Sequence, residues 1–138
     1  MMGKFSNIGL YTAKIRNKDS IEFVIFGICP SKANKYRVGR GGRFYVAPDV
    51  VAYANSFAMQ VAKVPKHHFG VKDDLAVCYT SYVANMGQDC DNIEKTIQDC
   101  LQKTGIIHND NKIIYHEHYK ARDTVNPRVE IMISRLNQ

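Results

Sequence analysis

Three aspartates and one lysine are the residues of this sequence whose types and spacing could do chemistry. Asp89 and Asp91 are two residues apart, Lys95 follows Asp91 by four residues, and Asp110 lies further along the chain. Carboxylate oxygens are the ligands that Mg²⁺ and Mn²⁺ prefer, and a nearby lysine could stabilise a phosphate. The set is typical of a divalent-metal phosphodiesterase site, in which the ion polarises a phosphate and activates water; a second metal ion is compatible with it.

An amphipathic helix is expected to position these side chains. It is predicted to begin at Asp91, and Gly105 is its expected C′ residue. Asp91 and Lys95 would then share one face, and Asp89 could point to the same side if residues 86–90 are extended. The positive end of the helix would favour a phosphate beside the metal. The apolar stripe that predicts the helix consists of Ile93, Ile97, Cys100 and Leu101.

The same residues also fit a purely structural alternative. Asp91-Asn92-Ile93-Glu94 matches a capping box, in which Asp91 caps the helix and Glu94 reaches back to it. Asp110 lies between two asparagines and could be only a turn residue. Spacing alone leaves the catalytic and the structural interpretations open.

Two pairs of histidines are weaker candidates for a site. His116 and His118 flank Glu117 in a predicted strand, so they point to one side and could bind a transition metal, although no third ligand is near in sequence. His67 and His68 are adjacent and alternate in direction, which makes them a poor metal pair. The usual role of such histidines is structural.

The basic charge of the chain is concentrated in its N-terminal third. The formal net charge is +6, and residues 1–47 carry nine Lys or Arg against two Asp or Glu, whereas the remainder carries ten against eleven. A basic lobe beside an acidic cluster is suited to a polyanion such as nucleic acid. A solvated surface with a mild basic bias is the alternative.

A glycine-rich loop over residues 29–48 holds five of these bases. Basic side chains could pair with phosphates, and the interleaved aromatic rings could stack on bases or sugars. The structural alternative is a hairpin in which residues 36–38 pair with residues 43–45 across the turn 39–42, and a hairpin could also contact DNA. The residues predicted from this pattern to contact DNA are Lys32, Lys35, Tyr36, Arg37, Arg40 and Arg43.

The remaining patterns predict an α+β fold. Residues 21–28 are apolar on both faces and are expected to form a central strand. A second helix is expected over residues 48–64, begun by Pro48 and ended by Pro65. We expect residues 1–138 to form a single domain in which a mixed β-sheet packs against two main helices. Further strands are expected over residues 75–83, 112–121 and 128–133.

Composition points to a soluble, cytoplasmic protein. Its 138 residues, 45% hydrophobic and 23% charged, are typical of one globular domain. The longest apolar run, residues 23–29, is too short to span a bilayer, and the N-terminus lacks the apolar segment of a secretory signal. The four cysteines form no Cys-x-x-Cys pair and are expected to be reduced thiols.

At these residues the sequence resembles the RusA family of Holliday-junction resolvases. The family's central motif, Asp-x-Asp-Asn-x-x-Lys, stands here at residues 89–95, and the helix and glycine after it lead to an acidic pair that is Asn109-Asp110 here. The upstream motif Pro-Ser-x-x-Asn stands at residues 30–34, which adds Asn34 to the predicted DNA contacts. The resemblance extends over residues 21–136.

The resemblance implies a homodimeric, Mg²⁺-dependent endonuclease that nicks opposed strands of a four-way DNA junction symmetrically, in recombination and repair. It assigns metal binding to Asp89, Asp91 and Asp110 and an essential catalytic role to Lys95. Mn²⁺ is the expected substitute ion, and the protein could be of cellular or phage origin. One departure is Asn109 at the first acidic position, but the carboxylate that matches the family's ligand is the second, which is retained as Asp110.

Two other functions remain compatible with the sequence. The first is a metal-dependent nuclease that cuts branched DNA without preferring four-way junctions. The second is a DNA-binding protein without catalytic activity, whose carboxylates serve only as helix caps and turn residues.

Overall fold

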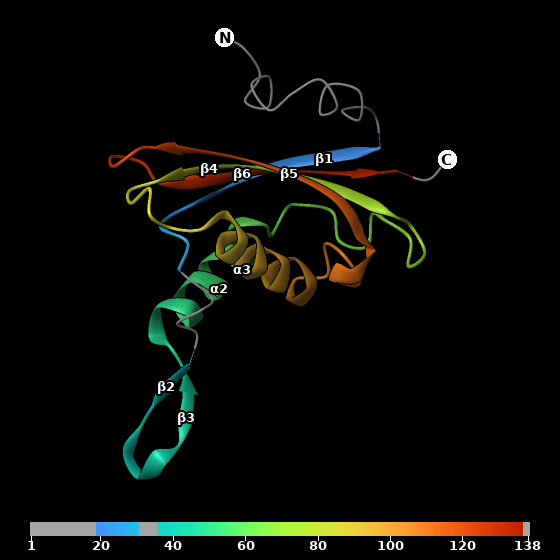
Figure 1. Ribbon diagram of the computed structural model, residues 1–138. Coiled ribbons are helices and arrows are strands. Elements are labelled where there is room, and N and C mark those ends of the chain that lie inside the picture. The colour runs from blue at the N-terminus through green and yellow to red at the C-terminus, as the bar shows by residue number, and fades with distance from the viewer. Residues whose placement is uncertain (1–18, 31–35, 137–138) are drawn as a thin grey trace.

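A four-stranded mixed sheet forms the body of the protein in a computed structural model that describes residues 19–30 and 36–136 (Figure 1). The strand order is β1-β6-β4-β5. Strand β6 is antiparallel to both of its neighbours, whereas β4 and β5 are parallel. The strands are β1 (Ser20–Phe26), β4 (Leu75–Val83), β5 (Ile113–Arg122) and β6 (Arg128–Arg135).

Strand β1 lies at one edge of the sheet, so the prediction that it is central is wrong. Ile25 is buried and Phe23 packs against the same core, but Glu22 and Phe26 are exposed. The strand ends where Gly27 adopts a φ of 115°. The apolar run of the sequence therefore reflects one buried face and an exposed apolar end, rather than two buried faces.

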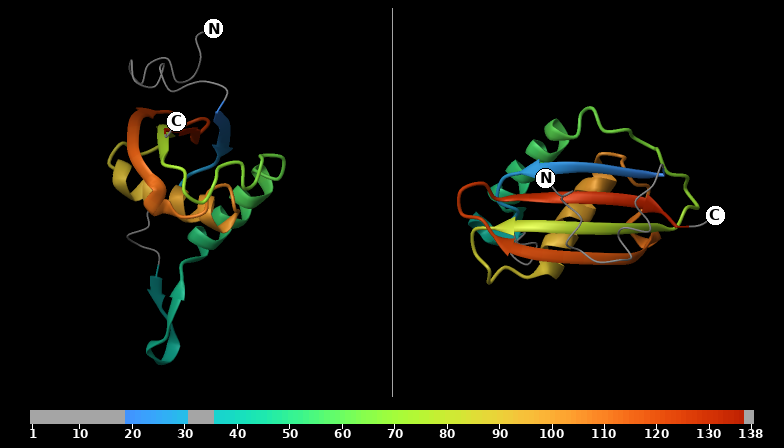
Figure 2. Two further views of the ribbon diagram at one scale, coloured as in Figure 1. Left: turned by 90° about the vertical axis from the view of Figure 1, so that its right-hand side faces the viewer. Right: turned by 90° about the horizontal axis from the view of Figure 1, so that it is seen from above.

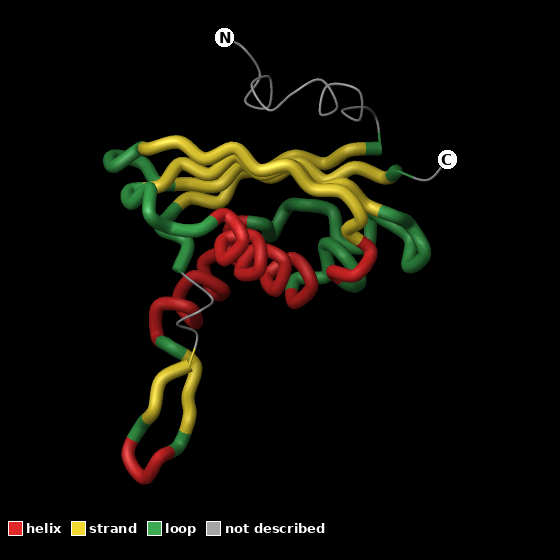
Figure 3. Tube along the Cα trace, in the orientation of Figure 1, coloured by secondary structure: helices red, strands yellow, loops and turns green. Residues whose placement is uncertain are grey.

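Both long helices cover the same face of the sheet (Figures 1 and 3). Helix α2 (Pro48–Gln60) buries Phe57 completely, and helix α3 (Cys90–Lys103) buries its apolar stripe against the sheet. Seen from above, the helices lie beneath the four strands (Figure 2). The predicted architecture, a mixed sheet packed against two main helices, is confirmed.

The two helices end differently. The amide of Ile106 donates to the carbonyl of Leu101, and Gly105 has a φ of 80°, so α3 ends in a Schellman motif at the expected glycine. Helix α2 ends at Gln60, four residues before the predicted end. Beyond that point the Lys66 ammonium donates to the carbonyl oxygens of Val61 and Val64 at 2.6 and 2.7 Å.

A β-hairpin projects away from the body of the protein (Figures 1 and 2). Strands β2 (Tyr36–Val38) and β3 (Phe44–Val46) pair antiparallel as a separate two-stranded sheet, joined by the short 3₁₀ turn η2 (Arg40–Gly42). Gly41 and Gly42 have φ values of 75° and 77°, which ordinary side chains rarely adopt. The predicted hairpin is confirmed.

Across residues 19–30 and 36–136, no helix has both the length and the apolar character needed to cross a membrane. The four cysteines, all of which lie in this part of the chain, are free thiols.

Candidate active site

Asp89 and Asp91 lie at the exposed start of helix α3. Asp89 is the N-cap residue, and the amide of Ile93 donates to its carbonyl oxygen at 3.2 Å. Within the part of the chain that the structure describes, the Asp89 carboxylate makes no capping hydrogen bond. Asp91 lies inside the helix, which begins at Cys90 rather than at Asp91. The capping-box alternative is therefore wrong, and both carboxylates are left exposed to solvent.

Lys95 lies beside Asp91, as the helical spacing predicts. The Lys95 Nζ and the Asp91 Oδ2 are 3.4 Å apart, and the two side chains are 55% and 78% exposed. An ion pair this exposed contributes little to stability. Its place at a helix N-terminus, where free backbone N–H groups attract anions, suits it to binding a phosphate.

The segment that precedes α3 is held from two directions. The Lys120 ammonium of strand β5 donates to the carbonyl oxygens of Met86 and Gln88 at 2.8 and 2.7 Å. On the other side, the Gln88 amide donates to the carbonyl of Cys29, and the Thr96 hydroxyl donates to that of Pro30 at 3.1 Å. These contacts fix the backbone on both sides of Asp89.

A hollow of about 450 Å³ lies next to Asp89. It is open to solvent, so a phosphate group or a hydrated ion could reach the carboxylate. The residues that line it are Ile28, Cys29, Pro30, Asn85, Gly87, Gln88, Asp89 and Asn92.

Asp110 lies near the other end of helix α3. It begins the short 3₁₀ helix η3 (Asp110–Lys112), and its backbone amide donates a hydrogen bond to the Gln102 Oε1 at 2.6 Å. At 1.5 Å per residue, the eleven steps from Asp91 to Gln102 span about 16 Å along the helix axis. Within one chain, the length of α3 therefore separates Asp110 from Asp91.

The residues present fit a magnesium ion only in part. Within residues 19–30 and 36–136, no group of three or more His, Cys, Asp or Glu side chains is arranged to hold a metal ion. Mg²⁺ commonly uses one or two carboxylates together with water and substrate phosphates. Asp89 and Asp91 match that smaller donor set, and one chain does not bring Asp110 to them.

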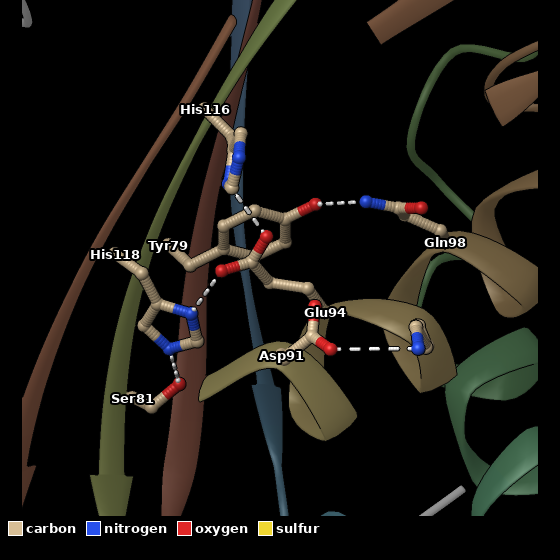
Figure 4. Close-up of polar contacts among 8 residues, drawn as sticks. Tyr79, Ser81, Asp91, Glu94, Gln98, His116 and His118 are labelled. Carbon is tan, nitrogen blue, oxygen red and sulfur yellow. Dashed lines mark hydrogen bonds and ion pairs between the residues drawn. The ribbon is translucent and has the colours of Figure 1, made fainter. Parts of the chain in front are cut away.

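A polar network that the sequence did not predict lies behind the exposed carboxylates (Figure 4). The Glu94 side chain is only 8% exposed. Its Oε2 accepts a hydrogen bond from His118 Nδ1 at 2.8 Å, and its Oε1 lies 2.7 Å from His116 Nδ1. His118 Nε2 lies 2.7 Å from the Ser81 hydroxyl, and its ring stacks on Tyr79. The sequence signal for this network is a row of polar residues at alternate positions of β5, facing a glutamate beside the apolar stripe.

The histidines of both pairs contact other side chains. In β5, His118 Nδ1 is hydrogen-bonded to Glu94, and His116 Nδ1 lies 2.7 Å from the same carboxylate. His67 stacks on His108 with the ring centroids 5.3 Å apart, and His68 packs edge-on against Phe69.

The thiol nearest the carboxylates is not activated. Burial raises the pKa of Cys90, and the Asp89 and Glu94 carboxylates add to this, although Lys120 lowers it. Cys29 is more deeply buried, and burial raises its pKa to about 12. Neither thiol is therefore poised to act as a nucleophile.

The predicted DNA contacts fall only partly within the described residues. Arg40 and Arg43 lie exposed in the projecting hairpin. Tyr36 and Arg37 lie in strand β2. Lys32, Asn34 and Lys35 lie outside the described residues.

Comparison with known proteins identifies the family. The family model described as Endodeoxyribonuclease RusA matches residues 28–134, which is well over half of the chain. The matched span includes Asp89, Asp91, Lys95 and Asp110. No curated protein matches the chain. The chain belongs to the RusA family of endodeoxyribonucleases, whose activity is that of Holliday-junction resolvases.

Proposed function

We propose that this protein is a Mg²⁺-dependent, structure-specific endodeoxyribonuclease that resolves four-way DNA junctions by symmetric paired nicking, in recombination and repair. Family membership supports nuclease activity on branched DNA. The observation that carries the proposal is the exposed pair Asp89 and Asp91 at the start of α3, with the Lys95 ammonium 3.4 Å from Asp91.

Asp89 and Asp91 would hold the ion, and Mn²⁺ should substitute because it prefers the same oxygen ligands. When bound, Mg²⁺ would polarise the scissile phosphate and activate water. Lys95 and the free N–H groups at the start of α3 would bind the phosphate beside it. The backbone contacts from Lys120 keep these donors in place before DNA arrives.

A homodimer would complete the carboxylate set. Asp110 is assigned to the site by the resemblance, yet in one chain it lies beside Gln102, at the far end of the helix from Asp91. We propose that Asp110 acts on the site of a second copy. A two-fold dimer would also present two sites to the two strands that must be nicked symmetrically.

The projecting hairpin would contact the arms of the DNA. Arg40 and Arg43 are exposed there, and Phe44 and Tyr45 are 74% and 49% exposed beside them. Arginine pairs with phosphates, and exposed aromatic rings can stack on unpaired bases at a branch point. The full set of proposed DNA contacts adds Tyr36, Arg37, Lys32, Asn34 and Lys35.

Because its four cysteines are free, the protein is proposed to act in a reducing cytoplasm.

A panel of labelled substrates tests the proposal. Four-way junctions, three-way junctions, flaps and linear duplex are incubated with the pure protein and Mg²⁺. The proposal predicts paired nicks in the four-way junction and much slower cutting of the others. Equal cutting of all branched substrates would identify a general branched-DNA nuclease, and tight binding without any cut would identify a binding module.

A further inference from the structure

Helix α3 presents different chemistry on the two sides of its N-terminal half. Asp91 and Lys95 are exposed to solvent. Glu94, between them in sequence, is buried, and its carboxylate faces the histidines of strand β5 (Figure 4). A buried carboxylate is costly unless it is paired and hydrogen-bonded. Its partners therefore reveal what holds this turn to the sheet.

We propose that Glu94, His116 and His118 form a positioning unit that holds the N-terminal turns of α3, and so the Asp91 and Lys95 side chains, at a fixed place against the sheet. The inference rests on the proposed function, because it concerns the same site. None of the three residues is proposed to touch DNA or metal; they act through the backbone that carries Asp91.

The hydrogen-bond chemistry gives the unit a defined geometry. A carboxylate oxygen accepts the hydrogen bond from an imidazole N–H, so in this pairing His118 carries a hydrogen on Nδ1. His118 contacts one Glu94 oxygen at 2.8 Å and His116 lies 2.7 Å from the other, so the two contacts together fix the orientation of the Glu94 side chain. In neutral His118 the Nε2 atom then accepts from the Ser81 hydroxyl, 2.7 Å away.

The unit is anchored in the core on its buried side. The His118 side chain is 5% exposed and stacks on the Tyr79 ring with centroids 5.2 Å apart. One turn further along the helix, the Gln98 amide donates to the Tyr79 hydroxyl at 3.2 Å. The helix is thus joined to β4 and β5 at two positions one turn apart, and burial raises the pKa of Tyr79 so that it stays a neutral hydrogen-bond partner.

Strand β5 also holds the chain just before the helix. Lys120 follows His116 and His118 at the next alternate position, and it donates to the carbonyls of Met86 and Gln88. The same face of one strand therefore fixes the backbone on both sides of Asp89. Apolar residues at positions 94, 116 and 118 could supply burial, but they would not impose directional contacts on this turn.

Amide hydrogen exchange of the full-length protein tests the unit without relying on activity. The Ile93 amide donates to the Asp89 carbonyl at 3.2 Å, so its exchange reports opening of the backbone that carries Asp89. A hydrogen bond to a charged group is strong enough that losing it in Glu94→Gln should raise Ile93 exchange about tenfold relative to the amides of β4. His116→Ala, which removes an exposed ring and should fold, is expected to give a smaller rise in the same amide.

Single-turnover cleavage of a four-way junction gives the second readout. Glu94→Gln should slow cleavage at saturating Mg²⁺ about tenfold, and leave the junction Kd in EDTA within about twofold, because the unit positions the site and does not bind DNA. The double variant Glu94→Gln with His116→Ala should be no slower than Glu94→Gln alone, since His116 acts through Glu94.

Two control variants distinguish a loss of positioning at the start of α3 from a general loosening of the fold. Ile97→Val opens a small cavity in the same helix, and His68→Ala removes an exposed imidazole outside the unit. The inference is overturned if Ile93 exchange rises no more in Glu94→Gln than in Ile97→Val, or if it rises while cleavage is unchanged. If the wild-type protein cuts no DNA, the proposed function fails, and the exchange data still decide whether Glu94 holds the turn.

Discussion

The Asp91 carboxylate lies 3.4 Å from the Lys95 ammonium on the exposed side of the N-terminal end of α3. The pair combines an oxygen ligand for a metal with a cation for a phosphate, at the end of a helix that itself attracts anions. The predictions that follow concern this pair, the residues that complete its site, and the surfaces that would bring DNA to it.

Replacing Asp91 with Asn should abolish cleavage of a four-way junction and preserve binding, because the change removes a charged metal ligand and keeps the shape of the side chain. Cleavage and junction Kd are measured on the same preparation. Asp49→Asn is the matched control, since Asp49 is the first-turn acid of α2. Loss of both binding and cleavage in Asp91→Asn would instead indicate a structural role.

Replacing Lys95 with Ala should lower the cleavage rate about 100-fold, the usual effect of removing one group that stabilises charge in the transition state. The concentration of Mg²⁺ needed for half-maximal rate should change far less. Lys103→Ala, in the last turn of the same helix, is the control. An unchanged rate in Lys95→Ala would exclude the proposed role of this lysine.

Mixing two inactive variants tests whether Asp110 acts across a dimer. Asp91→Asn and Asp110→Asn are expected to be inactive alone. If Asp110 serves the site of the partner, a mixed dimer contains one intact site and should recover nicking of a single strand. If Asp110 serves its own chain, every site in the mixed dimer carries one change and no activity returns.

A combined change of Arg37, Arg40 and Arg43 to Ala should weaken junction binding and flatten its salt dependence. Each lost phosphate contact lowers the slope of log K against log salt by about 0.9, so three contacts would lower it by about 3. Lys63, Lys72 and Arg122, all exposed and outside the hairpin, provide a control with the same loss of charge. The same slope in both triple variants would place the DNA elsewhere.

Thiol labelling as a function of pH tests the environment of Cys90 and Cys29. A raised pKa lowers the thiolate fraction at pH 8, so both should react more slowly with iodoacetamide than an exposed cysteine. Cys90, which is partly exposed, should react first, and Cys29, with a pKa of about 12, should react only on unfolding. Fast labelling of Cys29 in the native protein would contradict its burial.

The sequence predicted the elements that carry periodic signals. The apolar stripe around Ile97 and the glycine at position 105 located α3 to within one residue at its start. The turn glycines located the hairpin, whose strands differ by at most one residue from those predicted. In these segments the local pattern and the tertiary packing agree.

Whether a strand lies at the centre or at the edge of its sheet depends on tertiary pairing. The local sequence pattern predicted this position less well than it predicted the elements themselves. The apolar run that includes Phe26 suggested a central strand. Among the strands that the structure describes, however, β1 lies at an edge beside β6, and the Phe26 ring is exposed. Likewise, Glu94 fits a capping box by spacing, but the histidines of β5 provide stronger partners for its carboxylate. The separation of Asp110 from Asp91 depends on how the chain turns after α3.

The central claim is tested most directly by cleavage of a labelled synthetic four-way junction, with Mg²⁺ or with EDTA, by the wild-type protein and by Asp91→Asn. We predict paired symmetric nicks that require both Mg²⁺ and Asp91. Tight binding of the junction without any cut, with Mg²⁺ and with Mn²⁺, would contradict the account and make Asp89, Asp91 and Asp110 structural residues of a DNA-binding protein.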